Sequence, residues 1–454
     1  MIYLQKITIK HLGPIQELEM DIKDFNLLIG EQATGKSTIA KAIYFFRTIK
    51  TTTTDYLCQL YDTALYNGQD ASSGFNMTLK RELKSIFISL FGFSWDLDRR
   101  LYMRYDYAMN VWIDVIINQG SKPYISVRYS PKLYADLKKL EAEALKLHSS
   151  KVEMGAISLA YASKERLRKF DYIKQKVNSI FDDFQETYYI PAGRSMLTLL
   201  ANNRSMVNIE NLDLITRQFM QLIDSIHNVF SAGIRNAHSY YPDGNRPFDV
   251  SLVSEKLIAD LKGDYQYSAG KEYIIMQNDM DDQEKIPINF ASSGQQEVLW
   301  LLNQLYVLML KKEKAFVIIE EPEAHLYPSL QNQVMEFISY FSNINDSSIL
   351  ITTHSPYVLT SVNNLYYAGM IIRQFPQATK AVYSIIGNKC SIDPLEFTAL
   401  KLNPDSMTED LVNQELDEIM PEMIDEVSDD INGKYVKLFD IASSYIPEEK
   451  MVDE

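Results

Sequence analysis

A run of eight residues near the N-terminus constrains the fold of this chain more than any other feature. Residues 30–37 read Gly-Glu-Gln-Ala-Thr-Gly-Lys-Ser, which matches the pattern Gly-x-x-x-x-Gly-Lys-Ser. They follow an apolar run, residues 25–29, and lead into a stretch from about Ser37 with the apolar spacing of a helix. Glycines let backbone N–H groups close around phosphate oxygens, and the helix start adds its positive dipole end. The sequence therefore predicts a strand, a phosphate-binding loop and a helix, the beginning of an α/β fold.

The residues of this loop have defined roles if the ligand is ATP with Mg²⁺. Lys36 is expected to reach the β- and γ-phosphates, and Ser37 to be a ligand of Mg²⁺. The alternative is a glycine-rich strand–helix turn that binds nothing. The residues expected to contact the nucleotide are Gly30, Glu31, Gln32, Ala33, Thr34, Gly35, Lys36, Ser37 and Thr38.

A second apolar run ends in two carboxylates. Residues 316–319 are Phe-Val-Ile-Ile, and Glu320 and Glu321 follow them. In a P-loop ATPase, the first carboxylate at such a position holds Mg²⁺, directly or through water, and the second polarises the attacking water. Many ATPases have Asp first, and Glu320 is one methylene longer. We expect Glu320 to be a metal ligand and Glu321 to be the general base, whereas without residues 30–37 the pair would indicate a strand that runs into solvent.

Two further segments carry residues that suit a nucleotide site. Residues 291–295, Ala-Ser-Ser-Gly-Gln, precede an apolar helix, and small residues at a helix N-terminus form an anion site. Read alone, Ser292 is a helix N-cap, but its place before residues 316–321 favours nucleotide contacts by Ser292, Gly294 and Gln295. Residues 349–353 predict a buried strand that ends at His354, where an imidazole can contact a γ-phosphate. A lone histidine is more often structural.

These four segments, in this order, resemble the ABC ATPase superfamily. Its usual signature, Leu-Ser-Gly-Gly-Gln, differs from this chain at Ala291 and Ser293. The resemblance to ABC ATPases implies that two copies meet head to head, so that the signature of each contacts the nucleotide of the other. Residues 189–192, 320–328 and 353–356 carry a finer resemblance, to AAA-type ATPases of the RecF and overcoming-lysogeny-defect group.

The rest of the chain predicts how an ABC-ATPase core, with a mixed and parallel sheet, is extended by an inserted helical arm. Residues 3–10 and 15–22 alternate and predict an antiparallel pair, and residues 133–147 and 164–181 predict the two helices of the arm. The alternative to a binding role for this arm is a solvated antiparallel helix pair. Hairpins are predicted over 111–127 and 272–290, and a strand over 188–191. The predicted segments are 1–60 and 271–400 for the two parts of the ATPase core, 61–270 for the inserted hairpin and helical arm, and 401–454 for an acidic segment. This last segment either docks a partner or is a solvated or partly disordered end.

Composition narrows the class of partner. The chain has 454 residues and a net charge of −15, and its acidic residues crowd together after Glu409. This argues against a general nucleic-acid coat, although one dense basic stretch lies at residues 164–176. Two distant cysteines give neither a disulfide framework nor a zinc spacing. No stretch is long enough to span a bilayer and the N-terminus lacks a signal-peptide layout, so we expect a cytoplasmic protein without a membrane partner.

Three functions are compatible with this reading. The leading prediction is an ATP-hydrolysing sensor or scaffold subunit of an anti-phage defence system, similar to the AriA protein of PARIS or PtuA of Septu. Such a subunit controls a separately encoded effector nuclease of the TOPRIM or HNH kind, with DNA or a phage protein as trigger. Asp429 and Asp430 are paired, but without the βα scaffold that a TOPRIM nuclease needs. The alternative is an SMC- or RecF-like DNA-repair ATPase that clamps DNA. A transporter subunit is disfavoured by the long insertion between the P-loop and the signature.

Overall fold

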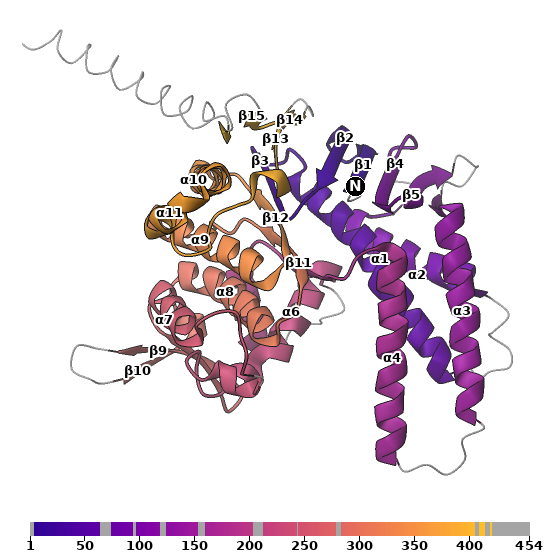
Figure 1. The fold of residues 1–454 in the computed structure, drawn as a ribbon, viewed down its shortest axis with the longest axis horizontal. Coiled ribbons are helices and arrows are strands. Elements are labelled where there is room, and N and C mark those ends of the chain that lie inside the picture. The colour runs from indigo at the N-terminus through magenta and orange to yellow at the C-terminus, as the bar shows by residue number, and fades with distance from the viewer. Residues whose placement is uncertain are drawn as a thin grey trace, which may run out of the picture.

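Two β-sheets and the helix packed between them form one of the two hydrophobic cores in the described part of the chain (Figure 1). The larger sheet has six strands in the order β14-β13-β3-β12-β11-β7, and the second has five in the order β2-β1-β4-β5-β6. The helix between them is α1, Lys36–Thr63. The computed structural model describes residues 4–63, 74–93, 97–118, 124–152, 159–202, 212–242, 244–277, 283–404, 408–413 and 418–419.

The six-stranded sheet is mixed, as the sequence predicts, because β14 pairs antiparallel with β13 while the other pairings are parallel. The predicted strands over 188–191, 316–319 and 349–353 are confirmed, whereas β13 was not predicted. The strands are β3 (Phe25–Gly30), β7 (Glu186–Ile190), β11 (Ala315–Glu320), β12 (Ser348–Thr353), β13 (Phe397–Leu402) and β14 (Thr408–Asp410).

Both faces of this sheet are covered, which explains its continuous apolar runs. Side chains alternate along a strand, so Phe316 and Ile318 pack with α1 while Val317 and Ile319 pack on the other face. The helices on that other face are α8 (Ser293–Lys311), α9 (Pro328–Asn345) and α10 (Pro356–Gln374), with α11 (Thr379–Ile386) beside α10.

The five-stranded sheet is antiparallel throughout. Its pairing of β1 with β2 and of β5 with β6 confirms the two predicted hairpins, although residues 119–123 between β5 and β6 lie outside the described residues. The unpredicted strand is β4, which pairs with β1 and brings β4–β6 into the core beside the N-terminal hairpin. The strands are β1 (Gln5–Leu12), β2 (Ile15–Ile22), β4 (Tyr102–Ala108), β5 (Val111–Asn118) and β6 (Tyr124–Tyr129).

A helical arm extends from this second sheet. Its helices, α3 (Pro131–Val152) and α4 (Leu159–Phe181), run side by side and pack on the C-terminal half of α1 (Figure 1). The helix α2 (Gly74–Phe91) also contacts α1. The two arm helices predicted from sequence are therefore present. Four apolar residues of the predicted helix 133–147 lie in the core with α1, namely Leu133, Leu137, Leu140 and Ala144.

The remaining elements flank α8. The helices are α5 (Arg194–Asn202), α6 (Leu214–Ile226) and α7 (Val250–Leu261), and a small sheet contains β8 (Asp264–Ser268), β9 (Lys271–Gln277) and β10 (Gln283–Pro287). The hairpin predicted over 272–290 is confirmed for β9 and β10, but residues 288–290 form a 3-10 helix instead of strand. After β14, the described part of the acidic segment contains the short strands β15 (Val412–Asn413) and β16 (Glu418–Ile419). Within the described ranges, no helix combines the length and apolar character needed to cross a membrane.

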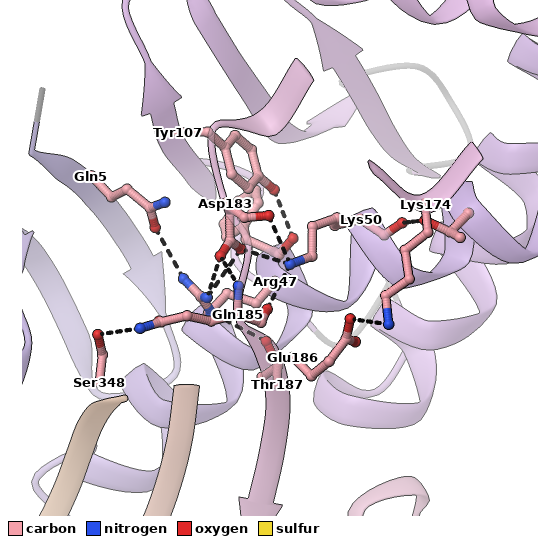
Figure 2. Close-up of polar contacts among 12 residues, drawn as sticks. Gln5, Arg47, Lys50, Tyr107, Lys174, Asp183, Gln185, Glu186, Thr187 and Ser348 are labelled. Atoms are coloured by element: carbon pink, nitrogen blue, oxygen red, sulfur yellow. Dashed lines mark hydrogen bonds and ion pairs between the residues drawn. The ribbon is translucent and has the colours of Figure 1, made fainter. Parts of the chain in front are cut away.

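A buried charge cluster fastens the arm to α1 (Figure 2). Asp183 lies two residues after the end of α4 and accepts a hydrogen bond from Arg47 Nη2 at 3.0 Å, while Lys50 Nζ lies 3.3 Å from its carboxylate. Arg47 also donates to Thr187 on β7 and to Gln5 on β1. One guanidinium therefore connects α1, the end of the arm and both sheets.

Asp183 ionises more readily than an ordinary aspartate. Its burial raises the pKa, but the charges of Arg47 and Lys50 outweigh that effect and the net pKa is lowered. A carboxyl group whose pKa is lower in the folded state stabilises the fold above its unfolded pKa of about 4 and loses that effect as pH falls through the folded pKa. The cluster is therefore a stabilising contact at neutral pH that acid removes.

Asp183→Asn is expected to lower the free energy of unfolding by about 3–5 kcal/mol, because two buried cations lose their anion. Urea unfolding at neutral pH measures the loss, and the difference from wild type should shrink below about pH 4. Glu186→Gln is the matched control, since its ion pair with Lys174 is partly exposed and contributes about 1 kcal/mol or less. An Asp183→Asn protein as stable as wild type would show that the cluster does not anchor the arm.

Candidate functional site

The phosphate-binding loop, residues 30–35, lies where β3 meets α1. Gly35 has a φ of +104°, and a Cβ there would come within 2.4 Å of Ile15 Cδ1 and 2.9 Å of Pro14 Cγ. Both the backbone conformation and the space therefore require glycine. The N–H of Ile39 donates to the carbonyl of Gly35 at 3.0 Å, so the helix begins directly in the loop and directs its first N–H groups toward it.

Lys36 lies inside the loop. Its Nζ donates to the carbonyls of Gly30 and Glu31 at 2.6 Å each, and the residue is 7% exposed. Burial lowers the pKa of Lys36, and the nearby carboxylates of Glu321 and Glu323 oppose that shift. The loop thus holds an ammonium group close to the acidic residues that follow β11. Of the other predicted loop residues, Thr34 is buried, Thr38 is half-buried, and Glu31, Gln32, Ala33 and Ser37 are exposed.

Glu320 is the last residue of β11, and the alternation along the strand places it on the α1 face with Phe316 and Ile318. It is 8% exposed; its Oε2 accepts a hydrogen bond from the N–H of Ala192 at 3.4 Å, while Oε1 has no hydrogen-bond partner. A buried carboxylate oxygen with free acceptor capacity fits a Mg²⁺ ligand. The exposed hydroxyl of Ser37, at the start of α1, is a second oxygen ligand that Mg²⁺ can use.

No cluster of three or more His, Cys, Asp or Glu side chains with metal-site geometry occurs in the part of the chain that the structure describes. Mg²⁺ that binds with a nucleotide keeps several waters and takes one or two protein ligands together with phosphate oxygens. The pair of Ser37 and Glu320 is compatible with that mode of binding.

Three polar side chains meet at the carboxyl ends of β11 and β12. The Nδ1 atom of His354 lies 3.7 Å from Glu321 Oε1 and 3.6 Å from Glu323 Oε1. Glu323 is buried, and its Oε1 accepts hydrogen bonds from Thr353 Oγ1 at 2.6 Å and from the N–H of His354 at 3.1 Å. The side chains of Glu321 and His354 are each 37% exposed. Glu323 therefore fixes the strand end, while Glu321 and His354 remain open to a ligand.

The signature-like residues lie at the start of α8. Ser292 Oγ accepts from the N–H of Gln295 at 3.3 Å, and Gln295 Oε1 accepts from the N–H of Ser292 at 3.1 Å, which forms a capping box. The N-cap reading of Ser292 is confirmed, and its contact with nucleotide stays a prediction. A Cβ on Gly294 would come within 2.9 Å of the carbonyl oxygen of His325. The first turn of α8 therefore packs tightly on the segment that follows β11.

The structure brings the predicted residues Lys36, Glu320, Glu321 and His354 to one edge of the six-stranded sheet. Sequence reasoning missed three buried residues at this edge, namely Glu323, Arg194 and Glu297. Glu297 directly precedes the apolar run 298–302 of α8, and a carboxylate next to such a buried run is the signal that could have indicated it, because an unpaired buried charge is costly. Arg194 lies two residues after the segment 189–192 and carries no such signal.

The chain matches a family model described as an AAA ATPase domain over residues 2–359. This match covers most of the 454 residues, so the chain belongs to the AAA ATPase domain family and is, in general class, an ATP-binding P-loop ATPase. None of the curated proteins matches it.

Several solved structures show a distant likeness. An Smc head bound to the C-winged helix domain of ScpA is 12% identical with a TM-score of 0.38, covering 91% of this chain and 99% of that one. The SMC head domain from Thermotoga maritima is 12% identical with a TM-score of 0.34, covering 79% and 92%. An Smc head domain with an extended coiled coil, bound to the C-terminal domain of ScpA derived from Pyrococcus furiosus, is 11% identical with a TM-score of 0.36, covering 95% and 99%.

Lys36→Ala is expected to abolish ATP binding, because the γ-phosphate loses the cation that the loop supplies. Calorimetric titration with ATP and Mg²⁺ measures the affinity. Lys41→Ala, five residues further along α1, is the matched control and should bind as wild type does. Unchanged affinity in Lys36→Ala would contradict the assignment of the loop.

Proposed function

We propose that this protein hydrolyses ATP at a site formed by two copies of the chain. Lys36 binds the phosphates, and Ser37 and Glu320 hold Mg²⁺, which neutralises charge on the phosphates. Glu321 accepts the proton of the attacking water, and His354 contacts the γ-phosphate. The observation that carries the proposal is the convergence of Lys36, Glu321 and His354 at one sheet edge, with both Glu321 and His354 open to solvent.

The second copy supplies the signature residues. Ser292 is exposed at the N-terminus of a 19-residue helix, where the helix dipole and the first N–H groups favour an anion. Two exposed aromatic residues lie close in sequence to the contact between Gly294 and His325. Phe290 is 76% exposed and Tyr327 is 78% exposed. Exposed aromatic side chains are enriched at protein interfaces. This surface supports a head-to-head dimer in which each Ser292 faces the nucleotide of the other copy.

Mixing two inactive variants tests the shared site. Ser292→Arg should leave ATP binding intact but block hydrolysis, and Lys36→Ala should block binding. Their mixture should recover part of the wild-type rate, up to about one quarter, because one site of each mixed dimer combines an intact loop with an intact signature. Phosphate release measures the rate, and differently tagged copies show that mixed dimers form. Mixed dimers without any activity would contradict the shared site.

We further propose that the ATPase cycle controls a separate partner, and that the protein is the sensor or scaffold subunit of an anti-phage defence system with a separately encoded nuclease. Two nucleotide states can act on a partner only if they differ in their affinity for it. The arm formed by α3 and α4 extends from the core and is a surface for such a partner (Figure 1). Residues 189–192, 320–328 and 353–356 resemble AAA-type ATPases of the RecF and overcoming-lysogeny-defect group. Members of that group with a complete nuclease place it as a TOPRIM domain after this core, which supports the nuclease as that partner.

The charges on α4 favour a protein partner over DNA. The sequence shows six bases there, but Arg166 pairs with Asp62, and Arg168 and Lys169 both lie near Glu165. Lys174 pairs with Glu186 at 2.7 Å, at the base of the arm. Phosphate binding depends on positive charge that is free to replace counterions. The paired bases of α4 therefore offer less of that charge than the sequence indicates.

Co-expression with the product of the neighbouring gene tests the defence role. The two proteins should co-purify, and the amount of bound partner should differ between ATP-bound Glu321→Gln and nucleotide-free Lys36→Ala. If the isolated protein instead binds duplex DNA in an ATP-dependent and salt-sensitive manner, the DNA-clamp function replaces this proposal.

A further inference from the structure

The side chain of Arg194 holds the backbone at the end of β11. Arg194 is the first residue of α5 and is fully buried. Its Nη1 donates to the carbonyls of Pro191 at 2.9 Å and Glu320 at 2.8 Å, and its Nη2 donates to the carbonyl of Glu321 at 3.0 Å. A guanidinium is planar and presents five N–H donors in a fixed geometry. It therefore sets the relative positions of the peptide groups that it bridges.

Glu297 extends this connection to α8. The Nε of Arg194 donates to the carbonyl of Glu297 at 2.8 Å, and Glu297 Oε2 accepts from the N–H of Arg194 at 3.0 Å. Its Oε1 accepts from the N–H of Ser195 at 3.0 Å and from Ser195 Oγ at 2.7 Å. Each side chain is bonded to the backbone of the other residue. The start of α5 is thus tied to α8 five residues after Ser292.

The backbone of Glu321 needs such support. Its φ is +44°, in the left-handed region that residues with a Cβ rarely adopt. A conformation of this kind persists only where the surroundings fix it. The N–H of Glu321 donates to the carbonyl of Thr352 at 2.8 Å, and its carbonyl accepts from Arg194. These two bonds hold the peptide groups on both sides of Glu321 and so direct its carboxylate.

The charges around Arg194 favour a geometric role. Burial lowers the pKa of Arg194, and the carboxylates of Glu297, Glu323, Glu320 and Glu321 oppose that shift. Buried ion pairs are weak evidence for stability, because apolar side chains of similar volume often stabilise a fold as well or better. What an apolar side chain cannot supply is the set of hydrogen bonds to Pro191, Glu297, Glu320 and Glu321.

We propose that Arg194 is a positioning residue that couples the signature helix α8 to the general base Glu321 of the same copy. Contact of Ser292 with the nucleotide of a second copy then sets the orientation of Glu321, through Glu297 and the guanidinium. The inference rests on the proposed ATPase function. It explains why hydrolysis requires the dimer, because each copy's base is positioned by its own signature helix, which contacts nucleotide only in the dimer.

Arg194→Lys tests this coupling, since it keeps the charge and leaves Glu297 paired but cannot bond all four carbonyls at once. ATP affinity and ATP-dependent dimerisation should remain close to wild type, while kcat should fall by about 10-fold or more at unchanged KM. Arg47→Lys is the matched control, because Arg47 is also buried and bridges several elements, at the opposite edge of the sheet. It should reduce thermal stability without a comparable loss of kcat.

The combination with Glu297→Gln gives a second readout. If Arg194 and Glu297 act as one connection, their effects on kcat should be non-additive in a double-mutant cycle. A wild-type kcat in Arg194→Lys, or an equal loss in Arg47→Lys, would overturn the positioning role and leave the ATPase assignment intact. A wild-type kcat in Glu321→Gln would instead overturn the assignment of the base, and the coupling inference with it.

Discussion

The burial of α1 between two sheets is the constraint on which the rest of the structure depends. Phe45, Phe46 and Ile49 are fully buried in a core shared by both sheets. A helix held on both sides has a fixed N-terminus, and that N-terminus carries the phosphate-binding loop. The requirement for glycine at position 35 follows from the same packing, because the hairpin of β1 and β2 leaves no space for a Cβ there.

Two buried arginines serve this core in different ways. Arg47 lies with Asp183 and Lys50 where α1, both sheets and the end of the arm meet (Figure 2). It bonds mainly side chains, and its loss is expected to appear as lost stability. Arg194 bonds backbone carbonyls at the edge that carries the carboxylates of Glu320 and Glu321. Its role is to fix geometry, which is why a kinetic measurement separates the two.

The strands that read as continuous apolar runs could be predicted, because strands covered on both faces leave no polar alternation. This applies to β3, β11 and β12. Two of the unpredicted strands depend on distant partners: β4 completes its sheet beside β1, and β13 adds to β3 from the far end of the chain. Such pairings leave little local signal, and β13 shows that the sheet continues past residue 400.

The sequence by itself determined the strand–loop–helix unit that begins at Phe25 and the residue types of the proposed nucleotide site, because the phosphate-binding pattern and the carboxylates after β11 depend on local spacing. Only the tertiary structure decided how Glu321 is held. Its left-handed backbone, the guanidinium of Arg194 and the carboxylate of Glu297 come from three segments far apart in the chain. Their contact results from packing α5 and α8 against the sheet, which no local pattern encodes.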